Sequence, residues 1–243
     1  MSQSSFGNKF KVTTWGESHG KALGAVVDGC PAGLSLCEED IQVFLDRRKP
    51  GQSKYTTARK EGDLVEILSG VFEGKTTGTP ISLMVRNTDQ RSRDYGNIAY
   101  SYRPGHADYT FDQKYGFRDY RGGGRSSGRE TIGRVAAGAI ASKILSELGI
   151  SICTYTKSIG PVEITTFDKE EINNNAFYMP DALTAAKAGE YLEECMKNQD
   201  SAGGVIECRI SGTPAGLGDP VFDKLNAVLA HALMSIGAVK AVE

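Results

Sequence analysis

The sequence predicts an α+β fold in which antiparallel sheets are flanked by helices. Short segments rich in strand-forming residues occur in groups, they do not alternate regularly with helices, and glycine-rich turns separate several of them. Of the 243 residues, 40% are hydrophobic and 24% are charged, which is ordinary for a globular chain and sufficient for a sizeable core. We therefore expect a single domain over residues 1–243.

Two helices are expected in the first part of the chain. The first follows Ser35, whose partner Glu38 three residues later forms a capping box, and it ends at Pro50. A second capping box, made by Ser127 and Glu130, opens a segment whose apolar residues recur at helical spacing as far as Gly149. We expect the second helix to lie against a sheet.

Two further helices are expected near the end of the chain, and strands fill the segments between. The third helix follows Asp181, and the fourth has Asp219 as its cap and Pro220 at the first helical position. Strand character is found over residues 9–15, 22–27, 64–72, 81–85, 152–155 and 205–210.

Charge and composition exclude several classes of protein. A formal net charge of −2 does not favour a nucleic-acid binder, whose affinity depends on neutralising phosphates, so any anion site must be local. No apolar run approaches the roughly 20 residues needed to cross a bilayer, and residues 1–10 do not resemble a secretion signal. The five cysteines lack metal-site spacing and disulfide density, which indicates reduced thiols in the cytoplasm.

Two segments combine basic residues with glycine. Residues 47–60 hold six cations around Pro50 and Gly51, and residues 103–129 hold further arginines around three consecutive glycines. The second segment carries Arg125, Ser126 and Ser127 into a helix N-terminus, where free backbone N–H groups and the helix dipole favour phosphate. Solvated surface loops, or basic residues that complement a helix C-terminus, are the alternatives.

Histidine is scarce, and two of the three histidines lie in loops flanked by glycine. A loop histidine such as His19 or His106 can exchange a proton near neutral pH, and a neighbouring phosphate favours its protonated form. An exposed turn residue is the alternative for each. His231 lies beside the apolar stripe of the fourth helix, which favours a buried or subunit-contact role.

Three common catalytic motifs are absent from the sequence. Residues 70–76 resemble a P-loop, but three residues separate the glycines where four are required, and Pro80 follows where a helix should begin. No Gly-x-Ser-x-Gly elbow occurs, and no histidine or cysteine cluster has metal-ligand spacing. Nucleotide hydrolysis, a hydrolase triad and a metal site therefore have no support.

Distinctive segments are spread over essentially the whole length of the chain. They are Gly16-Glu17-Ser18-His19-Gly20, Arg47-Arg48 with Pro50-Gly51-Gln52 and Thr56-Thr57, Leu68-Ser69-Gly70-Val71-Phe72, Thr76-Thr77-Gly78-Thr79-Pro80, Arg103-Pro104-Gly105-His106-Ala107-Asp108, Tyr120-Arg121-Gly122-Gly123-Gly124-Arg125-Ser126-Ser127, Arg129-Glu130-Thr131, Pro214-Ala215-Gly216-Leu217-Gly218 and His231-Ala232-Leu233-Met234-Ser235-Ile236. In these segments the chain resembles chorismate synthase.

The resemblance implies a β-α-β sandwich and a 1,4-elimination of phosphate from 5-enolpyruvylshikimate 3-phosphate, with reduced FMN required but no net redox change. It implies that His19 acts as general acid toward the departing phosphate and that His106 protonates or holds the reduced flavin. Substrate binding is implied for Arg48, Lys54, Arg59 and Arg134. Cofactor binding is implied for Arg125, Ser126, Ser127, Arg129, Gly237 and Ala238.

The chain departs from the family pattern at two places. Lys54 stands where many relatives have arginine, which keeps the charge but loses bidentate geometry. The chain also stops at Glu243, before a family segment that supplies further flavin and substrate contacts and the proposed base. We therefore expect this incomplete chain to be inactive alone, and the alternative function is a flavin- or anion-binding module.

Partners are also expected from the resemblance. Some family members reduce their own flavin with NADPH, but this sequence shows no reductase domain or dinucleotide fingerprint, so an external flavin reductase is expected. A homotetramer is implied as well. An RNA-contacting protein is a third interpretation, kept only because aromatic residues interleave with arginines over residues 109–120.

Overall fold

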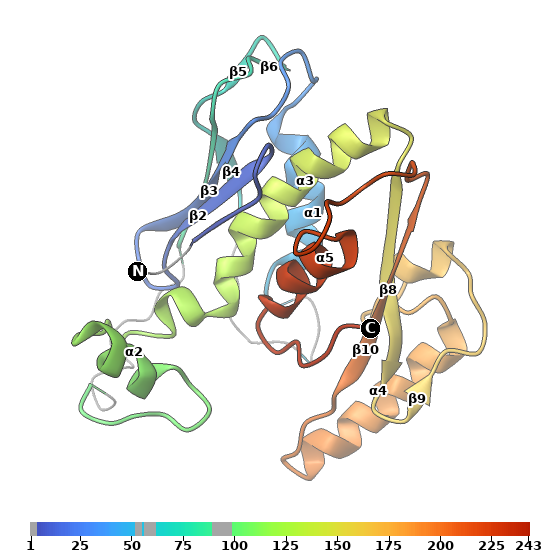
Figure 1. Cartoon of the computed structure of the whole chain (residues 1–243). Coiled ribbons are helices and arrows are strands. Elements are labelled where there is room, and N and C mark those ends of the chain that lie inside the picture. The colour runs from blue at the N-terminus through green and yellow to red at the C-terminus, as the bar shows by residue number, and fades with distance from the viewer. Residues whose placement is uncertain (1–3, 52–54, 56–61, 89–98) are drawn as a thin grey trace. The chain divides into compact units, whose positions relative to one another are not determined.

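The computed structural model describes residues 4–51, 55, 62–88 and 99–243, and its contacts divide the chain into two compact units (Figure 1). The first unit is drawn from residues 1–49, 59–144 and 214–243, and the second from residues 50–58 and 145–213. The expectation of a single domain stays a prediction.

The first unit contains a five-stranded antiparallel sheet with the strand order β1-β2-β3-β7-β4. In the centre of the sheet, Ala25 of β3 pairs with Thr14 on one side and Leu83 on the other. The strands are β1 (Ser5–Phe6), β2 (Lys11–Gly16), β3 (Ala22–Asp28), β4 (Val65–Ile67) and β7 (Ile81–Arg86).

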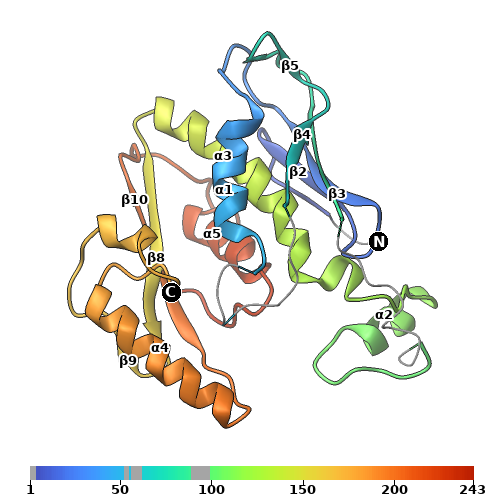
Figure 2. The same ribbon diagram turned by 180° about the vertical axis from the view of Figure 1, so that it is seen from behind.

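One face of this sheet is buried by two helices, α1 (Glu38–Arg48) and α3 (Thr131–Glu147), which lie near each other in both ribbon views (Figures 1 and 2). Successive strand residues point to opposite faces, so alternate positions of β3 and β7 are fully buried. Lys143 of α3 donates to Asp40 of α1 at 2.5 Å. The shared core contains Leu23, Ala25, Val27, Ile41, Leu45, Ile81, Leu83, Val85, Ile132, Ala136 and Ile140.

A glycine lets α3 approach the sheet closely. A Cβ atom placed on Gly133 would lie 2.6 Å from the carbonyl oxygen of Gly24 and 3.0 Å from Cγ2 of Thr14. Real Cβ atoms do not make such contacts, so the first turns of α3 need glycine at this position. The prediction that this helix packs on a sheet is confirmed.

The starts of α1 and α3 differ from the predicted capping boxes. The cap of α1 is Cys37, whose backbone N–H donates to Asp40, while Ser35 forms an isolated bridge with Lys75, so the predicted Ser35 cap is wrong. Ser127 caps the short 3₁₀ turn η3 (Gly128–Glu130), which leads into α3 one turn later than predicted. The two helices start later than predicted for different reasons. Ser35 is paired with Lys75, and the residues after Ser127 form a 3₁₀ turn, so the free N–H groups of each helix start are satisfied in another way than a capping box would satisfy them.

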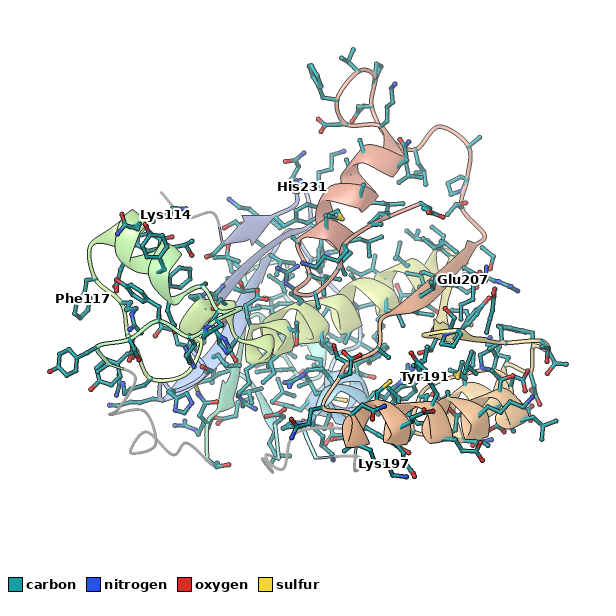
Figure 3. The ribbon with its side chains drawn as sticks, turned by 90° about the horizontal axis from the view of Figure 1, so that it is seen from below. Lys114, Phe117, Tyr191, Lys197, Glu207 and His231 are labelled. Atoms are coloured by element: carbon teal, nitrogen blue, oxygen red, sulfur yellow. The ribbon has the colours of Figure 1, made fainter. Side chains whose placement is uncertain are left out.

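Two features of the first unit were not predicted. The helix α2 (Asp108–Tyr115) ends at Gly116, which adopts the left-handed conformation with φ 71°, and the nearby Lys114 and Phe117 point outward (Figure 3). The hairpin of β5 (Val71–Phe72) and β6 (Lys75–Thr76) occupies the segment that resembles a P-loop. A strand follows this hairpin, β7, which agrees with the exclusion of a P-loop helix.

The helix α5 (Leu225–Met234) begins later than predicted. Lys224 is its cap, and Asp219 instead donates its backbone N–H to the carbonyl of Asp223 within a loop, so the predicted Asp219 cap and Pro220 start are wrong. His231 projects from this helix, with its ring 5.4 Å from that of Phe6, and is exposed, so the predicted burial is not found in this chain (Figure 3).

The second unit has a three-stranded antiparallel sheet with the order β10-β8-β9 and one long helix, α4 (Ala182–Lys197). Asp181 accepts a hydrogen bond from the N–H of Thr184 at 3.0 Å, which confirms the predicted start of α4. The other elements are β8 (Ser151–Ile159), β9 (Val162–Glu163), η4 (Glu170–Asn173) and β10 (Gly204–Ser211). Helices combined with antiparallel sheets confirm the α+β prediction.

Within the part of the chain that the structure describes, none of the helices has the length and apolar character needed to span a membrane.

Candidate active site

His19 lies in a tight turn that connects β2 to β3. The turn begins at Gly16, where φ is 84° and a Cβ would lie 2.4 Å from the carbonyl oxygen of Ala22, so only glycine fits. The N–H of Gly20 donates to the carbonyl of Glu17 at 3.1 Å and closes the turn. His19 is 8% exposed, which shows that it is a buried side chain and not the exposed turn residue of the alternative.

The glycine loop of residues 122–124 packs directly on this histidine. Gly122 has φ 67°, and a Cβ at this position would lie 2.3 Å from Cδ2 of His19 and 2.7 Å from Nε2. The absence of a side chain at Gly122 is therefore what makes room for the imidazole ring. The glycine-rich loop and the loop histidine, which the sequence predicted as separate features, form one site.

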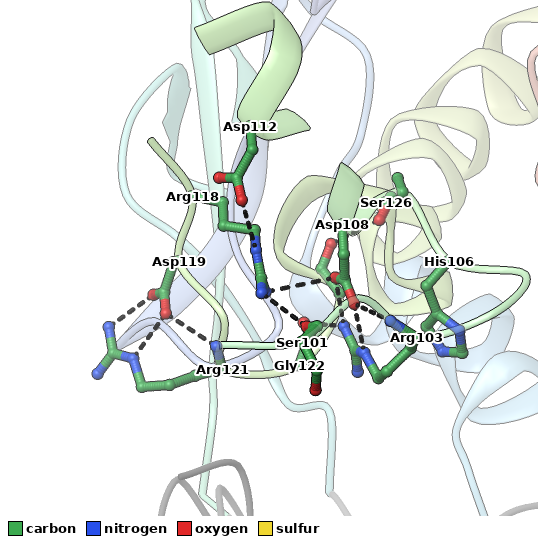
Figure 4. Close-up of polar contacts among 12 residues, drawn as sticks. Ser101, Arg103, His106, Asp108, Asp112, Arg118, Asp119, Arg121, Gly122 and Ser126 are labelled. Atoms are coloured by element: carbon green, nitrogen blue, oxygen red, sulfur yellow. Dashed lines mark hydrogen bonds and ion pairs between the residues drawn. The ribbon is translucent and has the colours of Figure 1, made fainter. Parts of the chain in front are cut away.

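The loop that carries His106 is anchored to the same glycine. Arg103 donates to both carboxylate oxygens of Asp108 at 2.8 Å, and it also donates to the carbonyl of Gly122 at 2.9 Å (Figure 4). These hydrogen bonds from Arg103 hold the pKa of Asp108 well below its usual range. His106 itself is exposed, with Nδ1 3.0 Å from the carbonyl oxygen of Pro104.

Arg125 joins the glycine loop to the end of β2. Its guanidinium donates to the carbonyl of Gly16 at 3.0 Å and to Oγ1 of Thr14 at 2.6 Å. The hydroxyl of Ser126 donates to the carbonyl of Gly123 at 2.7 Å, while Ser127 accepts from the N–H of Arg129. The predicted anion-binding segment is thus an ordered turn.

A small pocket that is open to solvent lies against this turn. The carboxylate of Asp119 also lines it, and Arg121 donates to both oxygens of Asp119 at 2.8 and 2.6 Å (Figure 4). Arg121 holds the pKa of Asp119 below its usual range, and His19 adds a smaller effect in the same direction. The lining residues are Glu17, Ala107, Asp108, Phe111, Arg118, Asp119, Gly122, Gly123, Gly124, Arg125 and Ser126.

Arg48 and Arg129 share one buried carboxylate. Asp63, whose side chain is fully buried, accepts from Nη1 of Arg48 at 3.2 Å and from Nη2 of Arg129 at 2.9 Å. Nε of Arg129 donates to the side-chain oxygen of Asn87 at 3.0 Å. The loss of one partner from such a buried pair costs about 3–5 kcal/mol, so this arrangement is fixed firmly.

Arg134 connects the start of α3 to the segment after α5. It donates to Glu130 at 2.9 Å, to the hydroxyl of Ser235 at 2.6 Å and to the carbonyl of Ser235 at 3.1 Å. Gly237 and Ala238 follow two and three residues later in the chain, so the hydrogen bonds of Arg134 bring the segment that leads to them beside the start of α3. Lys54 and Arg59 lie outside the described residues.

Three residues of this site were missed by sequence reasoning. Asp63 and Asn87 carry no motif and are found only through their partners. Arg103, in contrast, belongs to the quoted segment around His106, and its separation of five residues from Asp108 was a usable signal for an ion pair.

The geometry brings a buried histidine, a glycine turn with a helix behind it and several arginines together within one unit. A histidine beside an anion-binding turn can transfer a proton to a leaving group whose charge the neighbouring donors stabilise. This fold and this arrangement of residues are typical of enzymes that transfer a proton while they bind an anionic compound.

Comparisons with known proteins identify the family. The sequence model of chorismate synthase matches residues 10–243. The chorismate synthases of Agathobacter rectalis and Lachnoclostridium phytofermentans are 71% and 69% identical, and each comparison covers all of this chain and 67% of the relative. The chorismate synthase of Novosphingobium aromaticivorans is 59% identical over all of this chain and 68% of its own length.

A solved structure described as the crystal structure of chorismate synthase has the same fold. It is 34% identical, has a TM-score of 0.78, and matches over 96% of this chain and 68% of that chain. The chain belongs to the chorismate synthase family, whose members are lyases of the shikimate pathway of aromatic biosynthesis. It spans about two thirds of the length of these relatives.

Proposed function

We propose that this chain carries the phosphate-leaving half of a chorismate synthase active site. The reaction is the 1,4-elimination that converts 5-enolpyruvylshikimate 3-phosphate to chorismate, the last step of the shikimate pathway. A ring C–H bond breaks, its electron pair enters the new double-bond system, and the C–O bond to phosphate breaks with its pair on phosphate. The observation that carries this proposal is the packing of His19 on Gly122 of the anion-binding turn, within a family match over residues 10–243.

His19 serves as the general acid toward the departing phosphate. Its burial keeps water away from the ring, and the ring packs against Gly122, which lines the pocket together with Arg125 and Ser126. A phosphate there favours the protonated imidazole, which then neutralises the leaving dianion.

The substrate anion is bound by Arg48, Lys54, Arg59 and Arg134. Arg48 shares the buried Asp63 with Arg129, and this ion pair fixes the position of the Arg48 guanidinium, whose side chain is 18% exposed. Arg134, although paired with Glu130, remains 36% exposed at its side chain and can reorient toward a ligand.

Reduced FMN is the proposed cofactor, and the residues present fit an anionic group of this kind. Ser18 provides a buried hydroxyl that has no hydrogen-bond partner among the described residues, and it lies beside the backbone of Gly122. Arg125, Ser126, Ser127, Arg129, Gly237 and Ala238 would hold the cofactor, and exposed His106 would hold or protonate its pyrimidine edge. When bound, reduced FMN supplies electron density to the elimination and regains it afterwards.

The guanidinium of Arg129 is engaged inside the protein with Asp63 and Asn87. Its backbone N–H donates to the hydroxyl of Ser127, so its proposed part in cofactor binding is to fix Ser127. We further propose a cytoplasmic homotetramer that receives reduced flavin from an external reductase and does not itself use NADPH.

The test is anaerobic release of phosphate from 5-enolpyruvylshikimate 3-phosphate with chemically reduced FMN. The 243-residue chain is compared with a version extended to the length of its relatives, and His19→Ala, His106→Ala and His231→Ala are made in the extended version. We expect turnover only in the extended version, losses on the order of 100-fold or more for His19→Ala and His106→Ala, and little change for His231→Ala.

The result that separates the alternatives is binding without turnover. If the extended protein binds reduced FMN but releases no phosphate, the elimination is wrong and a flavin-binding module becomes the better description. If the 243-residue chain turns over as fast as the extended one, its expected inactivity is wrong.

A further inference from the structure

Asn87, the residue directly after β7, holds both ends of the turn that carries His19. Its side-chain Nδ2 donates to the carbonyl of Glu17 at 3.0 Å and to the carbonyl of Gly20 at 2.8 Å. Its backbone N–H donates to the carbonyl of Lys21 at 3.1 Å. Since Asn87 is only 9% exposed, water competes poorly for these three hydrogen bonds.

The oxygen of the same amide faces the arginine network. Oδ1 accepts from Nε of Arg129 at 3.0 Å, and Arg129 continues to Asp63 and from there to Arg48. The amide therefore uses both of its N–H donors on the His19 turn and its oxygen on a guanidinium. An aspartate of the same size has no N–H donor, and an alanine supplies neither group.

We propose that Asn87 is a positioning residue for the proposed elimination. It fixes the position of the His19 turn relative to Arg48, to which it is joined through Arg129 and Asp63. This inference rests on the proposed function for its catalytic meaning. The structural reason is that the turn of four residues is closed by a single backbone hydrogen bond, from Gly20 to Glu17. Asn87 adds the two hydrogen bonds that tie the turn to the neighbouring strand end.

Two variants distinguish the donor group of the Asn87 amide from its acceptor oxygen. Asn87→Asp keeps an oxygen for Arg129 but loses both donations and places a negative charge beside two carbonyl oxygens. Asn87→Ala loses both the two donations to the turn and the oxygen that accepts from Arg129. The matched control is Asn175→Ala in the second unit, because Nδ2 of Asn175 also donates to two carbonyls, those of Glu171 at 2.9 Å and Met179 at 2.8 Å.

The first readouts are conformational and use the full 243-residue chain. Amide hydrogen exchange of Gly20 reports opening of the turn, and diethylpyrocarbonate labelling followed by mass spectrometry reports access to His19, with exposed His106 and His231 as internal standards. We expect both rates to rise about tenfold or more in Asn87→Asp and Asn87→Ala, and to stay within about twofold of wild type in Asn175→Ala.

A measurement on the unaltered chain covers the case in which the variants fail to fold. The side-chain amide protons of Asn87 should exchange at least about tenfold more slowly than those of exposed Asn226. Equal exchange of the two side chains, or unchanged Gly20 exchange and His19 labelling in folded Asn87→Asp, would overturn the inference.

The catalytic consequence is read separately in the extended version. There Asn87→Asp should lower kcat about tenfold or more with KM within about threefold, because a misplaced acid affects the transition state more than substrate binding. If the extended wild type does not turn over, the proposed function is wrong, but the exchange and labelling results still test whether Asn87 holds the His19 turn. If kcat is unchanged, the positioning role fails.

Discussion

Replacing Gly122 by alanine tests directly whether the glycine turn and His19 are one packed unit. The new Cβ would lie 2.3 Å from Cδ2 of His19, and the backbone would keep φ at 67°. A left-handed conformation costs a non-glycine residue about 1–2 kcal/mol, and overpacking costs about 1–3 kcal/mol more. We therefore expect the free energy of unfolding to fall by about 2–5 kcal/mol.

Gly124→Ala is the matched control. Gly124 is also left-handed, with φ 52°, but a Cβ there would have no heavy atom within 4 Å. Only the backbone cost of about 1–2 kcal/mol applies, so the two variants should differ by about 1–3 kcal/mol.

Urea unfolding followed by tryptophan fluorescence is the suitable assay. Trp15 is the single tryptophan of the sequence and lies in β2 of the first unit, so its emission reports the unit that contains the site. In a His19→Ala background most of the extra loss of Gly122→Ala should disappear, because the imidazole ring is gone and only Oγ of Ser18, at 3.1 Å, remains close to the new Cβ. Equal losses for the two glycines, or an extra loss that persists without His19, would refute the packing argument.

Two further predictions concern α3 and α4. Gly133→Ala should destabilise the first unit by about 1–3 kcal/mol. Gly138→Ala, at an exposed position of the same helix with open space around it, should instead stabilise the unit by about 0.5–1 kcal/mol. Loss of stability in both variants, measured by urea unfolding, would contradict the close approach of α3 to Gly24. Hydrogen bonds, first among them the one from the N–H of Thr184, hold the pKa of Asp181 far below its usual range. The ionised carboxylate therefore stabilises the folded state fully above the ordinary aspartate pKa of about 3.9, and this contribution to the free energy of unfolding is lost as the pH falls below that value. Asp181→Asn should be less stable than wild type by about 1–3 kcal/mol at pH 7, because an amide nitrogen cannot accept the hydrogen bonds that Oδ2 receives from the N–H groups of Thr165 and Thr166. Thermal unfolding followed by far-ultraviolet circular dichroism should show this difference in stability becoming smaller toward acid pH, and a difference that stays constant would contradict the linkage.

The sequence allowed the main elements to be predicted because their signals are local. Alternating apolar residues define β3 and β7, and the helical spacing of apolar residues defines α3. The start of α4 after Asp181 was predicted correctly, and the capping bond that Asp181 accepts from Thr184 is likewise local, because the two residues are three apart in sequence. Local signals also account for the two wrong caps. Ser35 and Asp219 have suitable side chains, but Ser35 forms a bridge with Lys75 and the backbone N–H of Asp219 donates to Asp223, and the sequence pattern shows neither contact.

The site was predictable in part for a different reason. His19, His106 and the turn at Arg125 belong to distinctive segments, so they could be named before their geometry was known. Their meeting point could not, because Gly122 and His19 are about a hundred residues apart in sequence and no periodicity records their contact. Asp63 and Asn87 act only through distant arginines, and short-range patterns carry no trace of such partners.

The bond from Arg103 to the carbonyl of Gly122 has a consequence for how the two histidines respond to ligands. Gly122 supports the ring of His19 on one side and is held on the other by the loop of His106. A ligand that shifts either loop therefore changes the free energy of the other, and by thermodynamic linkage the effect is equal in both directions. Phosphate bound beside His19 and flavin bound beside His106 should each alter the affinity for the other by the same factor.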